Sequence, residues 1–143
     1  MELIKNLNYY FCILKFPNVN AIPFIKVQEE YPLNYLERLS YIDNSKIEYI
    51  DFILNQINID VFEKNLCFHL EQYQSTLIEV YPDYCNVYEQ FTSNILFKLE
   101  TSLLLKLLNE WRDFLVDFYT KKWVYVPCEQ VKEKYLMELD KKE

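Results

Sequence analysis

The segment Asn94–Lys121, "NILFKLETSLLLKLLNEWRDFLVDFYTK", changes its hydrophobic period partway along. Apolar and polar residues alternate over Asn94–Glu100, which is typical of a strand with one buried face. After Thr101 the large apolar residues recur at helical spacing instead. They form one stripe, made of Leu104, Leu108, Trp111, Leu115 and Phe118 and widened by Leu107 and Phe114. We therefore expect a strand followed directly by a long amphipathic helix, Ser102–Lys121, laid on a sheet.

The chain ahead of this segment alternates in the same way over three further stretches. These stretches are Leu66–Glu71, Thr76–Tyr81 and Tyr84–Phe91. Only short turns separate them, and Pro82-Asp83 is a favourable type I turn dipeptide. Four strands joined by short turns predict an antiparallel meander.

Both ends of the chain offer weaker signals. Asn8–Phe16 is rich in aromatic and β-branched residues, which is typical of a strand, and Phe24–Gln28 is a candidate second strand. Near the C-terminus, Val126-Pro127 is placed to begin a short last helix with proline at its first position.

Two helix starts lie between these strands and the meander. Asn34 is an N-cap residue type followed three residues later by Glu37. Ser45 and Glu48 have capping-box spacing, and apolar residues follow them at helical intervals. The pattern predicts an amphipathic helix over Ser45–Asn58.

These elements together predict an α+β fold. An antiparallel β-meander packs against a long C-terminal amphipathic helix, and further helices precede the meander. With 143 residues and no internal repeat or low-complexity linker, the chain is expected to form a single domain over residues 1–143.

Composition excludes several classes of site and partner. The sequence has no glycine, which excludes P-loop, dinucleotide-binding and nucleophile-elbow motifs, because each needs glycine at fixed positions. A net charge of −7 disfavours nucleic acid and anionic membranes as partners and favours a basic protein. The sequence has no run long enough to span a membrane and no signal-peptide pattern, so we expect a cytoplasmic protein.

The alternation divides the predicted meander into two faces. The apolar face carries Leu66, Phe68, Leu70, Ile78, Val80, Cys85, Val87, Ile95, Phe97 and Leu99. The other face carries His69, Glu71, Tyr73, Glu79, Tyr81, Tyr84, Asn86, Tyr88, Lys98 and Glu100. A slip of one residue in any strand would exchange the faces of that strand.

A face rich in tyrosines and carboxylates has two interpretations. It is either an ordinary solvated sheet surface or a partner-binding face, in which tyrosines give rigid contact area and acids select a basic partner. Under the second interpretation, the candidate partner-binding residues are Glu71, Glu79, Tyr81, Asp83, Tyr84 and Tyr88.

Few residues are candidates for catalysis or metal binding. His69 is the only histidine, and Cys67 and Glu71 flank it at strand spacing, but no nucleophile motif surrounds it. Cys67 and His69 could both bind a metal, yet no second pair supplies further ligands, so we expect no metal and no cofactor. The four cysteines, which include Cys12, Cys85 and Cys128, form no C-x-x-C pair. We expect free thiols, with two disulfides as the alternative. Glu110, Asp113 and Asp117 fit a solvated outer helix face.

The segments Leu77–Phe91 and Phe97–Tyr119 carry a resemblance. A hydrophobic strand there leads into a helix with a W-x-x-F-L pattern, formed by Trp111, Phe114 and Leu115. This arrangement resembles the C-terminal strand–strand–helix half of small acidic bacterial immunity proteins, which are encoded beside polymorphic or contact-dependent toxins. The resemblance implies a cytosolic protein that binds and neutralises one toxin domain, and many such toxins are basic nucleases.

The sequence thus leads to one main functional hypothesis and two alternatives. The main one is an immunity protein without enzymatic turnover, bound to a cognate toxin domain. The alternatives are a non-catalytic scaffold or oligomerising protein, and a small enzyme that uses His69 with Cys67 or a carboxylate. The sequence leaves the oligomeric state and the identity of the partner open.

Overall fold

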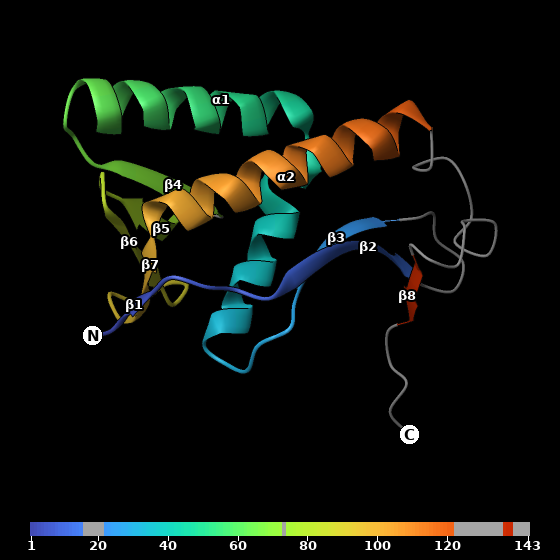
Figure 1. Ribbon diagram of the computed structural model, residues 1–143, viewed down its shortest axis with the longest axis horizontal. Coiled ribbons are helices and arrows are strands. Elements are labelled where there is room, and N and C mark those ends of the chain that lie inside the picture. The colour runs from blue at the N-terminus through green and yellow to red at the C-terminus, as the bar shows by residue number, and fades with distance from the viewer. Residues whose placement is uncertain (16–21, 73, 122–135, 139–143) are drawn as a thin grey trace.

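The computed structural model of the chain describes residues 1–15, 22–72, 74–121 and 136–138 (Figure 1). Its fold is α+β, as predicted. The elements, in chain order, are β1 (Leu3–Ile4), β2 (Tyr9–Lys15), β3 (Ile22–Val27), the 3₁₀ helix η1 (Leu33–Ser45), α1 (Ile47–Ile57), the π-helical turn η2 (Asn58–Glu63), β4 (Phe68–Gln72), β5 (Ser75–Val80), β6 (Tyr84–Tyr88), β7 (Ile95–Glu100), α2 (Thr101–Thr120) and β8 (Leu136–Glu138).

The predicted meander forms most of a five-stranded sheet. The strand order is β1-β7-β6-β5-β4, and β4 to β7 pair antiparallel with their neighbours in sequence. The antiparallel meander is therefore confirmed. The sheet is mixed because β1 adds to its edge in parallel with β7. Two residues are too few to show an alternating pattern, so the sequence did not predict β1.

The two predicted N-terminal strands belong to a second, three-stranded sheet. β2 pairs antiparallel with β3, and β8 pairs parallel with the other edge of β2. The strand predicted from Phe24 begins two residues earlier, at Ile22. β8 was not predicted, and the helix expected from Val126-Pro127 lies outside the described residues.

The predicted start of the first α-helix was wrong. α1 begins at Ile47 with Lys46 as its N-cap, so Glu48 is the second helical residue and the spacing of a capping box from Ser45 is lost. The backbone of Lys46 is extended, and Lys46 makes no side-chain capping bond. At its other end the helix continues into η2, beyond the expected end at Asn58.

The helix predicted from Asn34 is also different. η1 begins at Leu33, so Asn34 lies inside it, and the helix is of the 3₁₀ type. Glu37 does not act as a capping partner. Its carboxylate instead accepts a 2.9 Å hydrogen bond from the backbone N–H of Val27, which fixes η1 against the edge of β3.

The long helix α2 occupies Thr101–Thr120, as predicted to within one residue at each end. It runs beside α1 (Figure 1) and contacts strands of both sheets. Its fully buried residues include Leu104, Leu107, Leu108, Trp111, Leu115 and Phe118, and all but Phe118 belong to a core that also takes residues from both sheets, η1 and α1. No helix within the described ranges combines the length and apolarity that crossing a bilayer requires.

One acid of the expected outer helix face has a different environment. Glu110 is only partly exposed, and its carboxylate accepts a 2.5 Å hydrogen bond from the hydroxyl of Tyr9 on β2. Asp117 pairs with Lys121 at 3.2 Å, and Asp113 is exposed beside Arg112. The interpretation as a solvated outer face therefore holds for Asp113 but is wrong for Glu110, because β2 packs close to this part of α2.

Candidate functional site

The strand register assigns the two faces of the five-stranded sheet. Phe68, Val80, Cys85 and Leu99 pair in one row, and Leu70, Ile78, Val87 and Phe97 pair in another. Both rows join the core under the helices. Between them lies a polar row that runs across four strands in the order His69, Glu79, Asn86 and Lys98. We call the side that carries this polar row, together with Tyr81, Tyr84 and Tyr88, the outer sheet face.

Two members of the predicted apolar face depart from it. Leu66 is 57% exposed and lies in the loop between η2 and β4, where its backbone N–H bonds to the carbonyl of Asp60. Ile95 is only partly buried because the register shifts between Val87 and Tyr88. On the other face, Tyr73 lies outside the described residues.

Glu79 on β5 is the centre of the outer sheet face. Its Oε1 accepts hydrogen bonds from Nδ2 of Asn86 at 2.9 Å and from the hydroxyl of Tyr88 at 3.1 Å. The hydroxyl of Tyr81 is a third donor to this carboxylate. Its Oε2 lies 3.7 Å from Nε2 of His69. The side chain of Glu79 is only 17% exposed, so these contacts hold a largely desolvated carboxylate in place.

The environment favours the ionised form of Glu79. Burial alone would raise its pKa, but the hydrogen bonds from Asn86, Tyr81 and Tyr88, with the nearby His69, outweigh burial and lower the pKa of the carboxyl below its ordinary value. The same bonds act oppositely on their donors. The hydrogen bond to Glu79 is the main cause that raises the pKa of Tyr81, and burial followed by Glu79 raises that of Tyr88. Both phenols are therefore donors over the whole physiological range.

The remaining tyrosine of the face stacks at one end of it. The rings of Tyr81 and Tyr84 lie 4.9 Å apart at an interplanar angle of 26°. Nζ of Lys98 lies 4.7 Å from the centre of the Tyr84 ring, within the range of a cation–π contact. These contacts restrict the rotamers of all three side chains.

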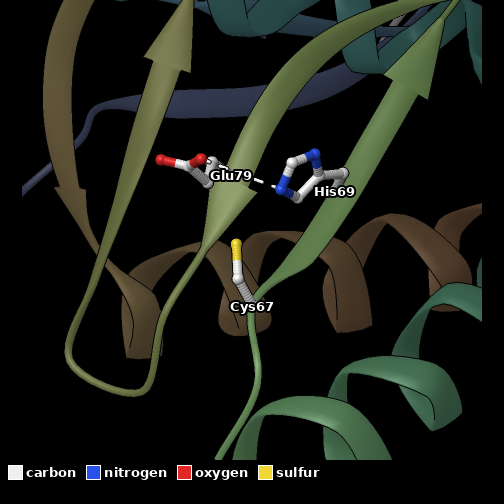
Figure 2. A group of neighbouring side chains, drawn as sticks. All are labelled: Cys67, His69 and Glu79. Carbon is white, nitrogen blue, oxygen red and sulfur yellow. Dashed lines mark ion pairs between the residues drawn. The ribbon is translucent and has the colours of Figure 1, made fainter.

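Cys67 and His69 meet Glu79 at the edge of this face. Figure 2 shows the three side chains directed toward one another, with Cys67 just before β4, His69 on β4 and Glu79 on β5. The thiol sulfur, an imidazole nitrogen and a carboxylate oxygen all lie within 4.8 Å of one another. Burial, with a smaller contribution from Glu79, raises the pKa of the Cys67 thiol despite a hydrogen bond with Tyr81. A thiol in this state is a poor nucleophile at neutral pH.

The structure brings together four of the six residues predicted to bind a partner. Glu79, Tyr81, Tyr84 and Tyr88 form one connected group. Glu71 is exposed on β4 opposite Thr76, beyond a register shift, and Asp83 is exposed in the turn between β5 and β6. These two acids lie at the rim of the face.

Sequence reasoning placed His69, Asn86 and Lys98 on this face but did not include them in the site. The signal that selects them is cross-strand pairing with Glu79, directly or through Asn86, and this depends on the register. Cys67 was considered only as a partner of His69. Comparison of the chain with protein-family models, with curated proteins and with solved structures gave no match.

Proposed function

We propose that this protein acts by binding a protein partner through the outer sheet face. In keeping with the resemblance of its C-terminal half, we propose further that the protein is an immunity protein and that the partner is a basic bacterial toxin domain, which it neutralises in the cytosol. The observation that supports this proposal is the ordered group of Tyr81, Tyr84 and Tyr88 around the ionised carboxylate of Glu79.

Preorganisation explains why such a group would bind well. Tyrosine contributes a large contact area with few torsions to freeze, and here the hydroxyls of Tyr81 and Tyr88 are already fixed by Glu79. Little side-chain entropy is then lost when the partner binds. The exposed acids Glu71 and Asp83 at the rim, with the net charge of −7, would speed the approach of a basic partner.

The alternatives differ in what they require of the same face. A scaffold or oligomerising protein would use it against a second copy or a neutral partner, and sedimentation of the purified chain would reveal a second copy. An enzyme based on His69 would need an activated nucleophile or base, and the raised pKa of the Cys67 thiol argues against the first. Replacement of His69 by alanine would abolish activity in an enzyme and spare affinity in a binder whose interface does not include the imidazole.

The binding test uses two variants with different expected kinetics. The partner is isolated with the tagged protein, and association and dissociation rates are measured by surface plasmon resonance. Tyr84→Ala should mainly speed dissociation, at a cost on the order of 2 kcal/mol if the ring fills a pocket of the partner. Asp83→Lys should mainly slow association and alter its salt dependence.

A charge reversal elsewhere on the surface tests whether the effect of Asp83→Lys depends on the position of that acid. Glu48→Lys reverses an exposed acid in the first turn of α1, away from the outer sheet face, and should leave both rates close to those of the parent. If Tyr84→Ala and Asp83→Lys fold and bind like Glu48→Lys, the outer sheet face is not the interface. If a partner binds through this face but is not a toxin, only the immunity assignment fails.

A further inference from the structure

The cluster of Cys67, His69 and Glu79 has the composition of a transition-metal site. A thiol, an imidazole and a carboxylate are the three side-chain types that bind zinc in proteins. Three protein ligands with water in the fourth position is the usual arrangement of an open zinc site. The sequence offered Cys67 and His69 but no further ligand, and the pairing of His69 with Glu79 across β4 and β5 supplies it.

The distances suit one shared ion. A zinc ion lies about 2.0–2.2 Å from nitrogen and oxygen ligands, so two such atoms around a tetrahedral ion are roughly 3.4 Å apart. Nε2 of His69 and Oε2 of Glu79 are 3.7 Å apart, which is close to this spacing and too long for a direct hydrogen bond. A sulfur ligand at about 2.3 Å from the same ion lies roughly 3.6 Å from each of the other two donor atoms. All three donor atoms lie within 4.8 Å of one another, so a shift of at most about 1 Å in Sγ of the partly exposed Cys67 would bring the set to the spacing of a tetrahedral ion.

The surroundings of Glu79 are those of a prepared ligand. Its Oε1 is held by Asn86 and Tyr88, Tyr81 is a further donor to the carboxylate, and Oε2 lies toward His69. Hydrogen bonds of this kind orient ligating carboxylates in metal sites, and their removal typically costs 10–100-fold in affinity. The imidazole of His69 is 48% exposed, so an ion can reach the cluster from solvent.

We propose that Cys67, His69 and Glu79 form a binding site for a divalent transition-metal ion of the zinc type. Cys67 binds through Sγ, His69 through Nε2 and Glu79 through Oε2, and the fourth position is open to water. The thiolate and imidazole select zinc or cobalt over magnesium and calcium, which prefer oxygen ligands alone. This site does not depend on the proposed partner.

The test uses cobalt as a spectroscopic substitute for zinc. The reduced, chelator-treated full chain is titrated with Co²⁺ under anaerobic conditions. One equivalent should produce a thiolate-to-cobalt charge-transfer band in the near ultraviolet together with intense visible bands of a tetrahedral ion. Zn²⁺ should abolish these bands by displacement, and Mg²⁺ in large excess should not.

Four variants show whether these residues hold the ion. His69→Gln changes an exposed side chain and should weaken Co²⁺ binding at least tenfold, and Cys67→Ser should remove the charge-transfer band. Glu71→Gln, which neutralises an exposed acid on the same strand, and Cys12→Ala, which removes a buried thiol of the other sheet, should bind like the parent. Circular dichroism confirms that each variant folds. The proposal is overturned if the parent gives no band with Co²⁺, or if the band and affinity persist in Cys67→Ser and His69→Gln.

The hydrogen bonds to Oε1 of Glu79 should affect the affinity for Co²⁺ less than the ligands themselves do. Tyr88→Phe keeps all three ligands and removes one hydrogen bond to Oε1 of Glu79. It should weaken Co²⁺ binding by about tenfold while leaving the charge-transfer band in place. An unchanged affinity in this variant would contradict the role assigned to the Oε1 contacts.

Discussion

Asn86 on β6 donates its side-chain amide to Glu79 on β5 over 2.9 Å, while the other end of the same side chain, Oδ1, is buried without a hydrogen-bond partner in the described part of the chain. One half of this amide thus fixes a carboxylate, and the other half is desolvated without compensation. The burial of the unpaired Oδ1 is unfavourable, so Asn86 contributes to stability mainly through the hydrogen bond that it donates to Glu79.

Replacement of Asn86 by alanine should destabilise the fold through the loss of this bond. A hydrogen bond to a charged group contributes about 1.5–3 kcal/mol, and relief of the unpaired Oδ1 offsets part of it, so we expect a net loss of about 1–2 kcal/mol. Urea denaturation measures the change. Asn55→Ala, at an exposed position of α1, should change stability by less than about 0.5 kcal/mol. Equal effects of the two substitutions would show that the contact with Glu79 contributes nothing.

The hydrogen bond between Tyr9 and Glu110 predicts how stability depends on alkaline pH. Burial, followed by the bond and the charge of Glu110, raises the pKa of Tyr9 above its ordinary value of 10.0. The unfolded chain therefore loses this proton at a lower pH than the folded chain does. Stability from this group is complete below the unfolded pKa and is lost as the pH rises through it toward the folded pKa.

Tyr9→Phe should remove that contribution. At neutral pH the variant loses a hydrogen bond to a carboxylate at a partly exposed site, which costs about 1 kcal/mol. Above pH of about 10, the free energy of unfolding should fall less steeply for the variant than for the parent. Parallel slopes for the parent and Tyr9→Phe would contradict the raised pKa of Tyr9.

The meander and the long helix could be predicted because their residues follow one period over many positions. Alternation across β4–β7 and the stripe of α2 are set by which side chains must leave water, and the register kept almost all of them on the predicted faces. The start of α1 could not be predicted from Ser45 and Glu48, since spacing alone does not say which residue is the N-cap. Glu37 was assigned to a local cap but bonds to Val27, a residue of another element.

The candidate site could be predicted only in part, because several of its contacts join residues of different elements. Tyr81, Tyr84 and Tyr88 were recognised because they alternate with apolar residues along two strands. The link from Glu79 to His69, and through Asn86 to Lys98, depends on which residues pair across strands, and nothing local in the sequence fixes this pairing. Cys67 joins the site only because β4 and β5 are neighbours.

A pair of substitutions on α2 tests the packing of the core. Leu104 is fully buried and belongs to the core that unites both sheets, whereas Val116 on the same helix is 36% exposed. Leu104→Ala should cost about 2–5 kcal/mol because it leaves a cavity, and Val116→Ala should cost less than about 1 kcal/mol. Denaturant melts give both values, and a loss below 1 kcal/mol for Leu104→Ala would mean that α2 packs loosely on the sheet.

The cysteine thiols should react at different rates in the native protein, because they differ in exposure and those that are most buried are also protonated. Cys12, Cys67 and Cys85 are free thiols, and Cys128 lies outside the described residues. Burial raises the pKa of both Cys12 and Cys85 to about 11, despite a lowering by Lys26 in the first case and by Thr101 in the second. At pH near 8 these two thiols are therefore protonated as well as inaccessible. Cys67 is only partly buried, so a thiol reagent should modify it well before Cys12 or Cys85 in the native protein.

Peptide mapping by mass spectrometry after timed alkylation measures this order. In denaturant without reductant, all four cysteines should react at similar rates, because unfolding removes the burial that separates them. Zn²⁺ should slow the modification of Cys67 in the native protein if that thiol binds the ion, and Mg²⁺ should not. Fast native labelling of Cys12 or Cys85 would mean that the sheets open readily. Two or fewer reactive thiols in denaturant would mean that the cysteines are oxidised, contrary to the prediction of free thiols.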